Sequence, residues 1–152
     1  MISKKFLTFI FFVIISSLRV NSSYSIEPDI FVQSTVNRAS QTLNANLSKL
    51  EKIEKLKNIA KETVDIRGLG FYTLGSYRKT INEDQKKRYD ALFKEYFLKT
   101  FASRLAEYSN PEIEVKSKKK LNKNYTMVSS VLVATEQRPE VNIDWRIYTK
   151  NP

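Results

Sequence analysis

The residue types that most often carry catalysis are missing from this chain. Its 152 residues include no His and no Cys, so common zinc ligands, the thiol nucleophile and the imidazole base are all absent. The Asp and Glu residues are scattered, with no spacing typical of a metal site or of paired catalytic carboxylates. The sequence therefore predicts no metal site, no cofactor and no enzyme, and it favours a binding protein.

Aromatic residues instead form the strongest pattern. Large apolar side chains recur every three or four residues between 82 and 109, and most of them are aromatic. The series is Tyr89, Leu92, Phe93, Tyr96, Phe97, Phe101, Leu105 and Tyr108. This spacing places them on one face of a helix. Such a broad aromatic face predicts one wall of a pocket for an apolar ligand.

The helix that carries these residues has clear boundaries in the sequence. Asn82 is a good N-cap, and Gln85 stands in the capping-box position three residues later. The helix is expected to end near Ser109, before Pro111. The only three glycines of the chain precede it within residues 68–75, where they predict tight turns or a close backbone approach.

The remaining elements follow from periodicity. Residues 28–56 show helical spacing with a break expected near Asn44 or Asn46, and residues 57–67 predict a second short helix. After Pro111 the period changes to two, which predicts three antiparallel strands in hairpin succession. The apolar face of their sheet, including Ile143 and Trp145, is expected to pack on the aromatic face of the helix that begins at Asn82.

Residues 1–25 have the features of an export signal. Lys4 and Lys5 precede an apolar run over residues 6–15, and small residues end at Ser25. The run is too short to cross a hydrocarbon core of about 30 Å as a helix. Cleavage would leave a domain of residues 26–152 and lower the net charge from +10 to +7, because three of the 26 Lys and Arg residues lie in the leader. Export argues against a nucleic-acid partner.

Several segments resemble one known family. Residues 74–89 read Leu-Gly-Ser-Tyr-Arg-Lys-Thr-Ile-Asn-Glu-Asp-Gln-Lys-Lys-Arg-Tyr. They resemble the Leu-Gly-x-Tyr-Trp-Arg-x-Ala-Thr-x-x-Gln-Arg-x-x-Phe signature of the MlaC/Ttg2D (toluene tolerance) family, although Arg78 stands where the family usually has Trp. Residues 93–96, 101–105 and 144–146 are also similar, and the likeness extends over most of residues 30–150.

The resemblance implies a fold, a function and partners. The fold would be α+β, with a helical layer packed on a curved antiparallel sheet (NTF2-like/MlaC-like). The function would be that of a periplasmic phospholipid carrier that holds acyl chains in an apolar pocket. Its partners would be phospholipid, an inner-membrane ABC transporter complex and an outer-membrane lipoprotein complex, in the pathway that maintains outer-membrane asymmetry. The family continues with another strand and a C-terminal helix, so residues 26–152 are expected to be an incomplete, C-terminally truncated domain.

Ten residues from the aromatic helix, the segment before it and the strands are candidates for the lipid site. They are Phe71, Leu74, Tyr77, Phe93, Phe97, Phe101, Val131, Val133, Ile143 and Trp145. Burial of acyl chains contributes about 0.8 kcal/mol per CH₂, so such a pocket could extract a lipid without catalysis. Two alternatives remain open: a cationic periplasmic adaptor that docks on an acidic partner or membrane surface, and a non-functional truncated remnant of the carrier. An enzyme is the least favoured reading.

Overall fold

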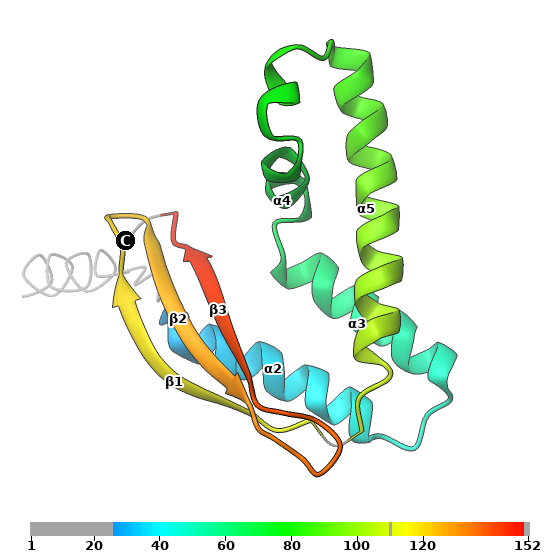
Figure 1. Cartoon of the computed structure of the whole chain (residues 1–152), viewed down its shortest axis with the longest axis vertical. Coiled ribbons are helices and arrows are strands. Elements are labelled where there is room, and N and C mark those ends of the chain that lie inside the picture. Colours follow the sequence, from blue (N-terminus) through cyan, green and yellow to red (C-terminus); the bar gives the residue numbers. More distant parts are fainter. Residues whose placement is uncertain (1–25, 110, 151–152) are drawn as a thin grey trace, which may run out of the picture.

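The computed structural model describes residues 26–109 and 111–150, and the predicted leader lies outside them. Within these ranges, four α-helices and one short 3-10 helix precede a three-stranded antiparallel sheet (Figure 1). The predicted α+β class is confirmed. The elements are α2 (Pro28–Asn44), α3 (Lys49–Thr63), α4 (Ile66–Thr73), η1 (Gly75–Lys79), α5 (Glu83–Leu105), β1 (Ile113–Lys120), β2 (Tyr125–Leu132) and β3 (Val141–Tyr148).

Capping boxes define the starts of two helices. At α5 the Gln85 backbone N–H donates to Asn82 Oδ1 at 2.9 Å, and the Asn82 N–H donates to Gln85 Oε1 at 2.9 Å. This reciprocal pair satisfies N–H groups that have no partner inside the helix, and it confirms the predicted capping box. Ser48 and Glu51 form the same motif at α3. The helix α5 ends at Leu105, short of the predicted end.

Two predicted helix boundaries are wrong. The predicted break between residues 56 and 57 does not exist, because α3 continues from Lys49 to Thr63 and buries Leu56 and Ala60 on one face. The glycines 68 and 70 do not form a turn either, since both lie inside α4. Gly70 is helical and buried, with the Phe93 ring against it. A Cβ at Gly70 would lie 2.9 Å from Phe93 Cδ1, so close packing explains this glycine.

The sheet presents its apolar face to α2. The strand order is β1-β2-β3, and the register pairs Val128 with Trp145 and Ser130 with Ile143. Directly opposed residues share a face, so these four side chains lie on one side of the sheet. Val32 and Val36 of α2, one turn apart, form a core cluster with Val128, which is fully buried; the half-buried residues around it are Phe31, Ile113, Val115, Trp145 and Ile147.

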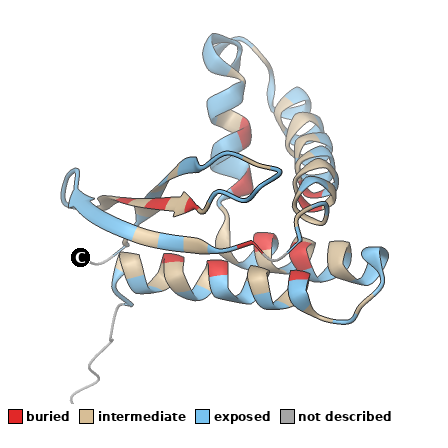
Figure 2. Cartoon of the chain, turned by 60° about the horizontal axis from the view of Figure 1, so that its bottom comes forward, coloured by how far each residue is buried: buried red, intermediate tan, exposed pale blue. Residues whose placement is uncertain are grey.

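Two parts of the molecule result, and we call them the platform and the arm. The platform consists of α2 and the sheet, while the arm consists of α4, η1 and α5, with α3 packed against both α2 and α5 (Figures 1 and 2). Figure 2 shows buried residues where α2 and the sheet face each other. Leu43, Leu56 and Ala102, from α2, α3 and α5, form the core cluster that joins the parts. The predicted packing of the sheet directly on α5 is therefore wrong, because α2 occupies that face.

Candidate functional site

A ladder of four stacked aromatic rings runs along α5. Tyr89, Phe93, Phe97 and Phe101 are spaced by four residues, which places them in one row on the helix. Successive ring centroids are 5.7, 6.2 and 5.1 Å apart, with interplanar angles of 24°, 18° and 12°. Each of the four side chains is half-buried. We call this row the aromatic ladder.

Only part of each ladder ring is covered by the protein core. Ala60, Ile66 and Leu98 form a buried cluster, and the phenylalanines of the ladder pack against it. The remaining surface of these rings is open, which is unusual for a phenylalanine whose only role is core packing. Two other large residues of the predicted face, Leu92 and Tyr96, are exposed; Tyr96 is 66% exposed. The apolar residues of α5 thus divide between the buried face, the half-open ladder and the solvent.

The helix α4 holds one end of the ladder. Its N-cap Asp65 accepts a hydrogen bond from the Gly68 N–H at 2.9 Å, which fixes the start of the helix. The Thr73 Oγ1 lies 2.8 Å from the Tyr89 hydroxyl, and this hydrogen bond joins α4 to the first ring of the ladder. Together with the contact of Gly70 on Phe93, it explains why the glycine-containing segment and the aromatic helix are close in the sequence.

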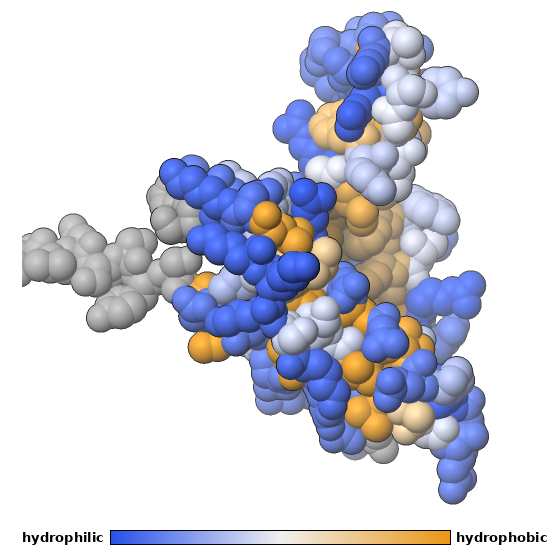
Figure 3. Space-filling model, turned by 60° about the vertical axis from the view of Figure 1, so that its left-hand side comes forward, coloured by the Kyte–Doolittle hydropathy of each residue, from blue (hydrophilic) through white to orange (hydrophobic). Residues whose placement is uncertain are grey.

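The face of the sheet toward α2 supplies a second apolar surface. Trp145 is half-buried, and its Nε1–H donates a 2.7 Å hydrogen bond to Ser130 Oγ, the one buried polar side chain among the described residues. This bond orients the indole and satisfies the serine hydroxyl. Ile143 and Ile147 flank Trp145 on β3 and are also half-buried. Figure 3 shows hydrophobic side chains gathered between the sheet and the arm, with hydrophilic ones over the outside of the sheet.

The structure brings together some of the ten candidate residues and separates others. Phe93, Phe97 and Phe101 share the ladder, and Ile143 and Trp145 share the sheet face toward α2. Val131 opposes Glu114 and Asn142 and therefore lies on the other face of the sheet. Val133 follows the end of β2, where its N–H donates to the Glu112 carbonyl at 2.9 Å.

The three remaining candidates lie in α4 and in the connection from α4 to α5. Phe71 is half-buried, with the Arg67 guanidinium 5.4 Å from its ring centroid in a cation–π contact. Leu74 is half-buried at the C-cap of α4, and Tyr77 of η1 is 71% exposed. These side chains belong to the arm but to none of the three core clusters of the described residues.

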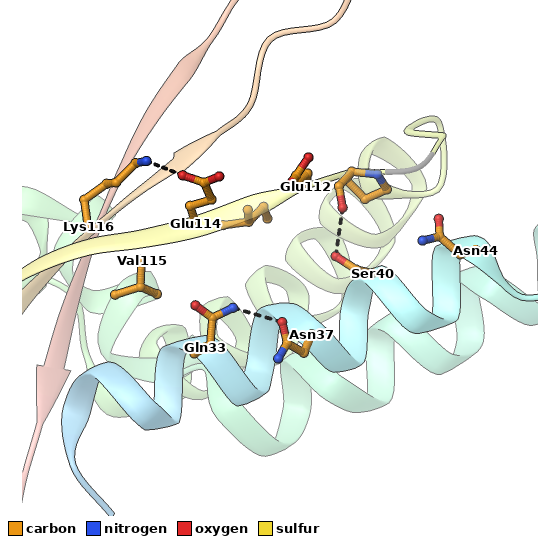
Figure 4. Close-up of a pocket in the computed structure, with 10 residues that line it drawn as sticks. Gln33, Asn37, Ser40, Asn44, Glu112, Glu114, Val115 and Lys116 are labelled. Carbon is orange, nitrogen blue, oxygen red and sulfur yellow. Dashed lines mark hydrogen bonds and ion pairs between the residues drawn. The ribbon is translucent and has the colours of Figure 1, made fainter.

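Two features of the structure were not predicted from the sequence. Tyr89 was included in the helical series but not among the ten candidates, although it completes the ladder; the four-residue spacing alone could have indicated it. A groove of about 660 Å³ also lies between α2 and β1, lined by Gln33, Asn37, Ser40 and neighbouring residues (Figure 4). Gln33 donates to Asn37 at 2.9 Å and Ser40 to the Pro111 carbonyl at 3.1 Å. This lining is too polar for an acyl chain, and it contains none of the ten candidates.

The ion pairs of the described residues lie at the surface. Lys118 of β1 forms 2.8 Å ion pairs with both Glu27 and Asp29 at the start of α2. The hydrogen bond from Lys118 lowers the pKa of Asp29, and the bonds to Asp29 and then Glu27 raise the pKa of Lys118. Over residues 26–109 and 111–150, no three His, Cys, Asp or Glu side chains are grouped as metal ligands would be. None of the helices in the described chain combines the length and apolarity needed to cross a bilayer.

The fold is α+β, and the candidate site consists of two half-open apolar surfaces, the aromatic ladder and the α2-side face of the sheet. The family model of the MlaC protein matches residues 33–152. The chain belongs to the MlaC family, which confirms both the resemblance and the prediction that it is not an enzyme.

Two relatives illustrate the relationship. The chain is 27% identical over 127 residues to the intermembrane phospholipid transport system binding protein MlaC of Haemophilus influenzae, and the match covers 80% of this chain and 59% of that protein. The structure resembles the phospholipid-binding protein of Ralstonia solanacearum, solved in complex with a phospholipid, with a TM-score of 0.63 and 16% identity. That alignment covers 79% of this chain and 69% of the other, and it supports the fold.

Proposed function

We propose that this protein is a periplasmic phospholipid carrier and that its acyl-chain site includes the aromatic ladder. The observation that carries the proposal is that Phe93, Phe97 and Phe101 are stacked in one row yet only half-buried. A protein gains nothing from leaving three phenylalanine rings partly in water, whereas an acyl chain laid along them would remove that surface from water at about 25 cal/mol per Å². Family membership and the phospholipid in the Ralstonia protein support the same ligand.

The sheet face around Trp145 supplies a second wall in this proposal. Ile143, Trp145 and Ile147 are half-buried on the side of the sheet that faces α2, and Figure 3 shows apolar groups between sheet and arm. Of the ten candidate residues, the ladder phenylalanines, Ile143 and Trp145 are the ones that we expect to contact acyl chains. Val131 lies on the opposite face of the sheet and is not expected to do so.

The wider role follows from the relatives and belongs to the same proposal. The named role of the Haemophilus protein is binding in an intermembrane phospholipid transport system. By analogy, this protein carries phospholipid between an outer-membrane lipoprotein complex and an inner-membrane ABC transporter, and the export signal over residues 1–25 directs it to the periplasm.

Native mass spectrometry of the exported chain tests the proposal directly. We expect a phospholipid to co-purify, and we expect the delipidated protein to take up a fluorescent phospholipid. The sequence contains one tryptophan, so the emission of Trp145 reports on the sheet wall. A blue shift on uptake is expected if an acyl chain reaches this face. A protein that carries no lipid and takes up none would contradict the proposal, and uptake without a Trp145 shift would remove the sheet face from the site.

A further inference from the structure

One end of the sheet carries a dense group of positive charges. It consists of the end of β1, the β1–β2 turn, the end of β3 and the residues that follow β3 up to Lys150, and we call it the basic end. Its five cationic side chains are all exposed: Lys119, Lys120, Lys123, Arg146 and Lys150. In Figure 1 the β1–β2 turn and the end of β3 lie together, away from the β2–β3 connection.

Hydrogen bonds hold the basic end in a defined shape. Asn122 Oδ1 accepts from the backbone N–H groups of Asn124 and Tyr125, each at 3.0 Å, which closes the turn. The Thr149 N–H donates to the Asn124 carbonyl at 2.8 Å, and Asn124 Nδ2 donates to the Thr149 carbonyl at 2.9 Å. These bonds fasten the end of β3 beside the turn. The cations are therefore presented together by a folded surface and not by a loose tail.

The positive charge of the basic end is not neutralised by its neighbours. Lys118, the residue before it, forms ion pairs with Glu27 and Asp29. Within residues 26–109 and 111–150, none of the five cations of the basic end forms an ion pair. The register places Lys119 and Arg146 on either side of Met127, so these two charges lie on one face of the sheet with Met127 between them. These like charges repel one another, and the surface therefore favours an anionic partner.

Apolar and aromatic groups lie among these charges. Leu121, at the turn between the lysines, is 43% exposed, and Tyr148 is 57% exposed. The Tyr148 and Tyr125 ring centroids are 5.2 Å apart, and the Arg146 guanidinium lies 4.4 Å from the Tyr125 ring centroid. An exposed leucine, tyrosines with a polar tip and long cationic side chains are the groups that enter the headgroup region of a bilayer together.

We propose that the basic end is a docking surface for an anionic phospholipid bilayer. The lysines and Arg146 would meet the lipid phosphates, and Leu121 and Tyr148 would enter the boundary between headgroups and acyl chains. A purely acidic protein partner would explain the cations but not the exposed leucine at the centre of the turn. The inference goes beyond the carrier function, since surface docking needs no acyl-chain site.

Vesicle co-sedimentation tests this inference with matched variants. The exported chain is expected to bind vesicles of phosphatidylcholine with phosphatidylglycerol, not to bind vesicles of phosphatidylcholine alone, and to lose binding as salt rises. Each basic residue near an anionic surface contributes about fivefold to partitioning. The affinity of the double variant Lys119→Glu/Lys123→Glu for these vesicles should therefore fall by a factor of about 25 or more. The control Lys94→Glu/Lys99→Glu makes the same charge change at exposed positions on α5 and should keep wild-type binding.

Two further measurements separate this inference from its alternatives. Leu121→Ser should weaken vesicle binding while far-UV circular dichroism stays unchanged. Soluble polyglutamate is the probe for an acidic protein partner: binding to it without binding to vesicles would overturn the proposal, as would equal loss in both double variants. Uptake of a soluble short-chain phospholipid should be the same in Lys119→Glu/Lys123→Glu and wild type. A failure of docking is thereby distinguished from a failure of the carrier function.

Discussion

The platform and the arm use apolar residues in different ways. In the platform, Val32, Val36 and Val128 close against one another and are almost completely buried. In the arm, Phe93, Phe97 and Phe101 pack on a buried cluster with one side and leave the other open. The first arrangement stabilises the fold and has no surface left to offer. In the second arrangement, the phenylalanines stabilise the fold less than fully buried rings would, and they retain apolar surface for a ligand.

Two substitutions test the comparison most strongly. They are expected to lower the free energy of unfolding by similar amounts but to affect phospholipid uptake differently. Val128→Ala removes two buried carbons and leaves a cavity, while Phe97→Ala removes a larger but half-buried side chain. We expect each to lower the free energy of unfolding by about 2 kcal/mol, measured by urea titration. Phospholipid uptake should fall about tenfold or more for Phe97→Ala and stay near wild type for Val128→Ala. Equal loss of uptake in both variants would show that the ladder has no role of its own.

Substitutions of two glycines test the same comparison, and their expected effects on stability and lipid uptake are smaller. Gly70→Ala would place a Cβ 2.9 Å from Phe93 Cδ1 and displace that ring. Gly75 has a φ of +55° and nothing near its Cβ position, so Gly75→Ala adds backbone strain without touching the ladder. Each change is expected to cost about 1 kcal/mol. Only Gly70→Ala should also reduce lipid uptake. If Gly75→Ala reduced uptake equally, the arm would act as one unit and not through the Phe93 ring.

The smallest effect concerns the ion pairs that fasten the platform. The pKa of Asp29 is lowered from 3.8 by Lys118, so its contribution to stability is present above pH 3.8 and is lost as the pH falls through the lowered value. The pKa of Lys118 is raised from 10.5 by Asp29 and Glu27, so its contribution is present below pH 10.5 and is lost above the raised value. The melting temperature of Lys118→Met should lie slightly below wild type between these limits. The two curves should meet at both extremes, whereas a constant difference would assign the effect to packing.

Much of the local structure was predictable from the sequence because it depends on neighbouring residues. The Asn82–Gln85 capping box, the helical period that follows it and the alternation of the strands are all set within a few positions. The structure confirmed the predicted α+β class, and the family model confirmed the family. The boundaries near Leu56 and Gly70 were wrong because helix continuity there depends on distant partners: α2 and α5 for Leu56 and the Phe93 ring for Gly70.

The sequence by itself determined the α+β class, the capped helix α5 and the three strands, that the described chain offers aromatic surface and no catalytic cluster, and which family it belongs to. Only the tertiary structure decided that α2 takes the apolar face of the sheet, that Val131 and Trp145 lie on opposite faces, and that the ladder is covered on one side only. The physical reason is that periodicity defines the direction of a side chain relative to its own element. It does not define which other element covers that side chain, because competing apolar faces are resolved only when the whole core packs.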